Sequence, residues 1–112
     1  MKTPLAAGET IVKEGGANLQ HDLESVGGRL FLTTHRLIFE SHALNVQTGV
    51  TILPLFAITE VQRCWTKFLN AIPLANNSVA VTMNQGVTFR FVVFGAPQWV
   101  AAIQSRQSPP LS

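Results

Sequence analysis

Charged residues are scarce in this chain. Asp, Glu, Lys and Arg make up 12% of its 112 residues, about half of the ~25% that is typical of soluble domains. Eight basic against six acidic residues leave a formal net charge of +2, and no run of lysine or arginine occurs. Because the basic residues are also not interleaved with aromatic ones, the pattern argues against nucleic acid as a partner.

The chain also has a single cysteine, Cys64. A disulfide within the chain is therefore excluded, and the cytoplasm is the expected compartment. Residues 1–7 lack the continuous apolar region of a signal peptide. No stretch approaches the ~18 apolar residues of a membrane span, since Pro54, Pro73 and Gly86 interrupt the longest apolar segments. Any membrane contact is expected to be peripheral.

Motifs of catalysis and metal binding are absent from the sequence. It contains no Gly-x-Ser-x-Gly, no Gly-rich phosphate loop ending in Lys and Ser or Thr, and no His-Glu-x-x-His. Asp22 and Glu24 beside His21 are interpreted as a solvated loop, and Cys64 as a buried thiol with no base beside it. We therefore predict no catalytic residues, no cofactor and no metal, and a chain that is not an enzyme.

Two apolar runs flank Thr34 and His35, and they are the clearest structural signal. A turn at these two residues would set four pairs across a β-hairpin: Leu32 with Leu37, Leu30 with Phe39, Phe31 with Ile38, and Arg29 with Glu40. The first two pairs form a face large enough to seed a core. The charged pair would lie at the open end of the hairpin.

Apolar residues alternate again over residues 79–93, which predicts a second hairpin with its turn at residues 84–86. Pro97 then suits the first turn of a C-terminal helix. In that helix Trp99 and Ile103 stand four residues apart and would face the sheet.

The remaining strands are expected over residues 10–14, 17–19, 50–53 and 58–65. Gly15 and Gly16 would form a bulge or bend within the first strand, and Gln20–Gly27 would be a loop. Pro54 cannot donate to a ladder, so its strand should end there or lie at an edge.

This order predicts one mainly β domain of six or seven strands with one C-terminal α-helix. The expected boundaries are a loose leader over residues 1–8, the domain over 9–106 and a flexible tail over 107–112. The expected structural core consists of Leu30, Leu32, Leu37, Phe39, Phe89, Phe91, Trp99 and Ile103.

Short pieces in a fixed order resemble the GRAM domain, a branch of the pleckstrin-homology-like superfamily. They are Gly8-Glu9, Gly28-Arg29-Leu30-Phe31-Leu32-Thr33, His35-Arg36-Leu37-Ile38-Phe39, Ile52-Leu53-Pro54-Leu55, Ile58, Val61, Trp99 and Ile103. GRAM hairpins often have Asn where this chain has Thr34, and a β-branched Thr disfavours the left-handed conformation that Asn tolerates. The resemblance implies a bent antiparallel β-barrel capped by its helix, and a non-enzymatic module for phosphoinositides, membranes or protein partners.

A candidate binding surface follows the predicted strand that ends near Cys64. It consists of Arg63, Trp65, Lys67, Phe68 and Leu69. Trp at headgroup level and Lys near anionic lipid suit a membrane interface, and the same aromatic residues suit a protein interface. The alternative is that these residues fold inward under the sheet.

The resemblance also implies phosphate contacts around the loop after the first strand. Asp22 and Glu24 in that loop would repel an anion, and the only basic residues that flank the loop are Lys13 and Arg29. Two partner classes therefore stay open. The first is anionic lipid at a membrane, and the second is a protein, including a second copy of the chain in a homo-oligomer.

Overall fold

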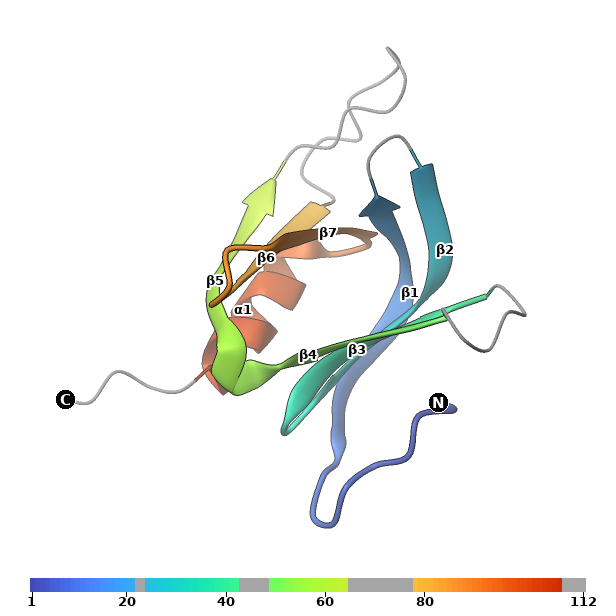
Figure 1. The fold of residues 1–112 in the computed structure, drawn as a ribbon, viewed down its shortest axis with the longest axis vertical. Coiled ribbons are helices and arrows are strands. Elements are labelled where there is room, and N and C mark those ends of the chain that lie inside the picture. The colour runs from blue at the N-terminus through green and yellow to red at the C-terminus, as the bar shows by residue number, and fades with distance from the viewer. Residues whose placement is uncertain (22–23, 43–48, 65–77, 108–112) are drawn as a thin grey trace, which may run out of the picture.

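The computed structural model describes residues 1–21, 24–42, 49–64 and 78–107. They form β1 (Ile11–His21), β2 (Glu24–Thr33), β3 (Arg36–Ser41), β4 (Val50–Pro54), the short 3-10 helix η1 (Leu55–Ala57), β5 (Ile58–Cys64), β6 (Ser78–Met83), β7 (Thr88–Val93) and α1 (Ala96–Arg106). The seven strands make one antiparallel sheet in the order β4-β3-β2-β1-β7-β6-β5 (Figure 1). The predicted mainly β fold with a C-terminal helix is confirmed.

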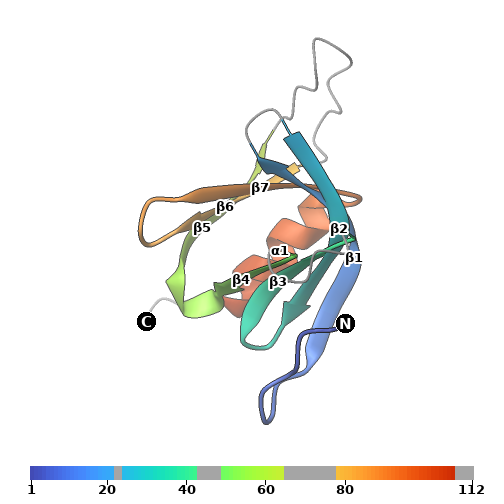
Figure 2. The same cartoon turned by 45° about the vertical axis from the view of Figure 1, so that its right-hand side comes forward.

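The sheet is strongly bent and not closed. Its two end strands, β4 and β5, follow one another in the chain and are joined by η1 at a corner. α1 lies inside the bend, against β5 and β6 (Figures 1 and 2). As predicted, β4 ends at Pro54 and lies at the edge of the sheet.

The β2–β3 hairpin has the predicted register, with all four expected residue pairs opposite one another. Its turn is fixed by Thr33, whose hydroxyl oxygen accepts hydrogen bonds from the backbone N–H groups of His35 (3.1 Å) and Arg36 (2.9 Å). A threonine that bonds the backbone two and three residues ahead stabilises a tight turn. The hairpin therefore closes without an Asn at Thr34.

Two expectations for the first strands were wrong. β1 runs without a break through Gly15 and Gly16, and its irregularity lies between Ile11 and Lys13. The polar stretch Gln20–Gly27 is not a loop, because β1 continues to His21 and β2 begins at Glu24. Cross-strand pairing outweighs the weak strand propensity of polar residues and glycine, which is a common effect of tertiary context.

Seven of the eight expected core residues are buried: Leu30, Leu32, Leu37, Phe39, Phe91, Trp99 and Ile103. The exception is Phe89, which is half-buried and packs against the cluster. The rings of Phe39 and Phe91 lie 5.8 Å apart between centroids and connect β3 to β7 across the bend. Trp99 and Ile103 on α1, 3% and 0% exposed, close this core from inside the curve.

The outer side of the sheet is also covered in one place, by the leader. The carboxylate of Glu40 accepts hydrogen bonds from the backbone N–H groups of Lys2 and Thr3, and the guanidinium of Arg36 donates to the Pro4 carbonyl at 2.7 Å. Ile38 stands between Arg36 and Glu40 on the same face of β3 and is fully buried. The leader was expected to be loose, but it crosses the sheet at this point.

The expected contact of Glu40 with Arg29 is replaced by this attachment. The Arg29 guanidinium lies 3.9 Å from the Glu14 carboxylate instead. Burial raises the pKa of Glu40, but the hydrogen bonds from Lys2 and Thr3 outweigh it and leave the pKa below its usual value.

Among the described residues, Glu9 is a buried charged residue, and its side chain is fully covered. Its carboxylate accepts two hydrogen bonds of 2.9 Å from the Arg36 guanidinium, one from the Thr33 hydroxyl and one from the Ala6 N–H. The hydrogen bonds from Arg36 are the main reason that the pKa of Glu9 is lowered from 4.5 to about 2.

This shift predicts acid sensitivity. A carboxyl group with a lower pKa in the folded than in the unfolded state stabilises the fold above the unfolded value, and the contribution is lost as the pH falls through the folded value. We therefore expect the free energy of unfolding to fall between about pH 5 and pH 2. Urea titrations across this range measure it. In a Glu9→Gln variant the slope should be smaller, and an unchanged slope would show that other carboxyl groups cause it.

Candidate functional site

The surface expected after β5 is only partly described by the structure. Arg63 is exposed near the end of β5, beside Pro97 and Val100 of α1. Trp65, Lys67, Phe68 and Leu69 lie outside the described residues. The structure therefore does not test whether these five residues form one surface.

The two candidate phosphate contacts lie on opposite sides of the sheet. The ammonium nitrogen of Lys13 is 5.2 Å from the centroid of a Trp99 ring, a cation–π contact on the side of the helix. Arg29 pairs across the strands with Gly16 and is exposed on the outer side. The structure does not bring Lys13 and Arg29 together.

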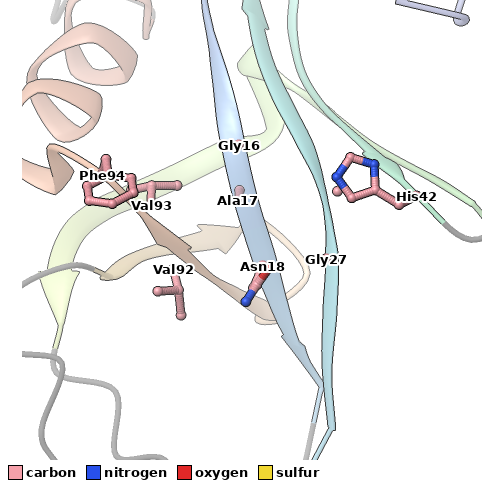
Figure 3. A pocket seen from close by; sticks show the side chains of 9 residues that line it. Gly16, Ala17, Asn18, Gly27, His42, Val92, Val93 and Phe94 are labelled. Carbon is pink, nitrogen blue, oxygen red and sulfur yellow. The ribbon is translucent and has the colours of Figure 1, made fainter.

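A groove lies on the outer side of the sheet and crosses β7, β1 and β2 (Figure 3). We call it the outer groove. It has a volume of about 460 Å³ and is lined by Gly16, Ala17, Asn18, Gly27, Gly28, His42, Val92, Val93 and Phe94. His42 lies on one side of β1 and β2, and Val92 and Phe94 lie on the other (Figure 3).

Gly16 and Gly27 lower the floor of the outer groove, because neither has a side chain to fill it. Gly27 lies opposite Asn18, and Gly16 opposite Arg29, in the β1–β2 register. A side chain at Gly27 would fill the groove, since an added Cβ would come within 3.3 Å of Asn18 Oδ1 and 3.8 Å of His42 Cδ2. The sequence predicts a bulge or bend at Gly16 and a loop that includes Gly27. Only the strand pairing shows that they form one floor.

The side of the sheet that carries the outer groove has an exposed aromatic side chain and two arginines. Phe94 directly follows β7 and is 91% exposed, which is unusual for a phenylalanine. Arg90 pairs with Gln20 and Arg29 with Gly16, so alternation along the strands places both arginines on the outer side with the groove. The site can therefore contact an apolar group and an anionic group together.

Cys64 lies near this face and is half-buried rather than fully buried. Burial raises the pKa of its thiol, and the nearby Arg90 guanidinium offsets part of that rise. A thiol with a raised pKa is a poor nucleophile at neutral pH. Cys64 also does not line the outer groove.

Within the described residues no three His, Cys, Asp or Glu side chains gather as they would around a metal ion. Asp22 lies outside these residues, and the side chains of His21 and Glu24 are not described. None of the described helices is both long enough and apolar enough to cross a bilayer.

Solved structures share this fold at low sequence identity. The C-terminal domain of an unknown protein from Leishmania infantum has a TM-score of 0.70 and 20% identity, with 89% of this chain and 85% of that chain covered. The N-terminal PH domain of Vps36 has a TM-score of 0.67 and 16% identity over 92% and 82%. The Slm1-PH domain in complex with inositol-4-phosphate has 0.64 and 17% over 88% and 98%.

At such identities these likenesses show the fold alone, which is PH-like. No curated protein matches the chain. The sequence model of the GRAM domain matches residues 1–98, which is most of the chain. GRAM and PH-like domains are generally binding modules for lipid or protein and not enzymes. Because the GRAM model matches residues 1–98, this chain belongs to the GRAM domain family.

Proposed function

We propose that this domain binds anionic phospholipid at a membrane surface through the outer groove, without catalysing a reaction. The observation that carries the proposal is Phe94, 91% exposed at the rim of a glycine-floored groove. The Slm1-PH domain was solved with inositol-4-phosphate, which supports a phosphorylated headgroup as the ligand. The domain would act in the cytoplasm as a peripheral membrane protein.

The residues in the outer groove and on the same side of the sheet suggest how each part of a lipid is contacted. Phe94 and Val92 offer apolar surface to the acyl boundary, where aromatic side chains are favoured. Arg29 and Arg90 attract the anionic headgroup, at about 1 kcal/mol for each basic residue near such a surface. Arg29 is only loosely held by Glu14, at 3.9 Å between nitrogen and oxygen in a solvent-exposed pair. Such a pair is weak and leaves Arg29 available.

The test compares two exposed phenylalanines. Phe94→Ala is expected to weaken binding to phosphatidylcholine vesicles that contain phosphatidylinositol 4-phosphate by roughly tenfold or more, because burying a Phe side chain contributes about 1.5–3 kcal/mol. Phe56 is 82% exposed on η1, away from the outer groove. Phe56→Ala should therefore leave binding unchanged in the same co-sedimentation assay.

The ionic part of the proposal has its own controls. Binding should decrease when salt is raised, since screening weakens contacts between exposed charges, and it should be absent with pure phosphatidylcholine. Equal losses for Phe94→Ala and Phe56→Ala, or no binding to the anionic vesicles at low salt, would contradict the proposal. Trp65→Ala and Phe68→Ala, measured alongside, test the surface of Arg63, Trp65, Lys67, Phe68 and Leu69 that the sequence predicts.

A further inference from the structure

The two end strands of the sheet differ in how their outer edges are covered. On β5, two glutamine side chains donate to backbone carbonyl groups: Gln104 of α1 to Val61 at 3.0 Å, and Gln107, which directly follows α1, to Ile58 at 3.1 Å. On β4, no described strand pairs with the edge that faces away from β3. An edge with unpaired backbone groups is a template for another strand.

The hydrogen bonds at both ends of the β3–β4 ladder show which groups this edge offers. Leu55 N–H donates to the His35 carbonyl, and Ser41 N–H donates to the Gly49 carbonyl. In an antiparallel pair the hydrogen-bonded positions alternate. The odd-numbered residues from 49 to 55 therefore direct their backbone groups toward β3, so Val50 and Ile52 direct theirs away from the sheet.

A second groove runs beside this edge, and we call it the edge groove. It has a volume of about 390 Å³, and its lining includes Ile52, Pro54, Phe56, Met83, Val87 and Phe89. None of the described residues that line it is charged. Ile52, Phe56 and Val87 are 43%, 82% and 50% exposed. The turn after β6 forms its far wall and is held to η1 by the Asn84 N–H, which donates to the Ala57 carbonyl at 2.7 Å.

We propose that the edge groove binds a single extended, uncharged peptide segment of a partner protein, which pairs with β4 as an added strand. The backbone of Val50 and Ile52 supplies the hydrogen bonds. Apolar side chains at alternate positions of the peptide pack on Phe56, Val87 and Phe89. The outer groove, on the other hand, shares its side of the sheet with Arg29 and Arg90, so the two surfaces suit different ligands.

The far wall of the edge groove favours a lone segment over a second copy of the domain. Paired strands lie about 4.8 Å apart. A second copy that paired through its own β4 would bring its β3 to the far side of the new strand, where the turn after β6 lies. A peptide with no neighbour on that side avoids this overlap.

The experiment uses an acetylated and amidated hexapeptide of alternating threonine and valine, followed by NMR of the full chain. We expect saturable shifts at β4 and at the turn after β6. Slower hydrogen exchange is expected at the N–H groups of Val50 and Ile52, and not at Thr51 and Leu53, which already bond β3. Ile52→Pro removes one outward N–H without a bond to β3, and edge strands tolerate such a proline. It should weaken peptide binding about tenfold.

Ile52→Thr keeps this N–H but replaces an apolar side chain that lines the edge groove, so it should lose clearly less binding than Ile52→Pro. If Ile52→Pro does not fold, the proposal is tested by hydrogen exchange at the N–H groups of Val50 and Ile52 in the original chain, with and without peptide. Equal binding by both variants, or unchanged exchange at Val50 and Ile52, would overturn the proposal. If hydrogen exchange at Val50 and Ile52 became slower as the protein concentration was raised without peptide, the edge would instead be assigned to a second copy. The same shifts on addition of phosphatidylcholine vesicles would assign it to lipid.

Discussion

Replacing Gly28 by alanine is expected to destabilise the domain by about 3 kcal/mol, the upper range for overpacking a tight site. A Cβ at this position would stand 2.2 Å from the Glu40 carbonyl oxygen, 2.7 Å from Phe39 Cζ and 2.9 Å from Ser41 Cα. Two of these three atoms belong to the backbone of β3, which cannot rotate away as a side chain can. β2 and β3 would have to separate where the core begins.

Gly16 provides the matched control for this prediction. It is also a glycine within a paired strand, but an added Cβ would meet nothing within 4 Å. Gly16→Ala should change the free energy of unfolding by less than about 1 kcal/mol. Urea denaturation measures both variants. Similar stabilities for Gly28→Ala and Gly16→Ala would mean that β3 does not approach β2 as closely as described.

Arg36→Met is expected to cost about 3 kcal/mol or more, because removing one partner of a buried ion pair leaves the other charge uncompensated. The Glu9 side chain is fully covered, and Arg36 supplies two of its hydrogen bonds and also binds the Pro4 carbonyl. The variant would therefore weaken the leader and the β2–β3 turn together. Thermal unfolding and urea titration both report this loss.

The pH dependence separates this electrostatic effect from simple loss of packing. Without Arg36 the pKa of Glu9 should rise, so Arg36→Met should lose less stability than the original chain as the pH falls from 5 toward 2. Arg29→Met is the control, since its exposed contact with Glu14 should contribute no more than about 0.5 kcal/mol. Parallel pH curves for Arg36→Met and the original chain would refute the assigned role of Arg36.

The sequence predicts the fold well wherever apolar residues alternate next to a clear turn. The hairpin around Thr34 and His35 has the register that the pattern predicts. The predicted C-terminal helix is also present, and Trp99 and Ile103 are buried on it as expected. The prediction failed at residues 20–27, because this polar stretch contains the paired ends of β1 and β2, where Gln20 lies opposite Ser25 and His21 opposite Glu24. Local propensity contains no information on such pairing.

The candidate site was less predictable than the fold, for two physical reasons. The outer groove depends on Gly16 and Gly27 lying on the same side of two paired strands, which follows from register and not from composition. Phe94 follows Arg90 and Val92 in the alternation of β7, which places it on the outer side, but only the structure shows that nothing described covers it there. Glu9 and Arg36 both lie within the GRAM-like motifs, but their contact joins residues 27 positions apart.

Gln104 and Gln107 affect whether domains can stack through the β5 edge of the sheet. Filaments of stacked domains need two complementary ends, so that every added unit exposes a fresh site for the next one. Gln104 and Gln107 occupy carbonyl groups that such growth would need at β5. The β5 edge therefore offers fewer free carbonyl groups for strand pairing than it otherwise would, which disfavours growth of a stack from that end.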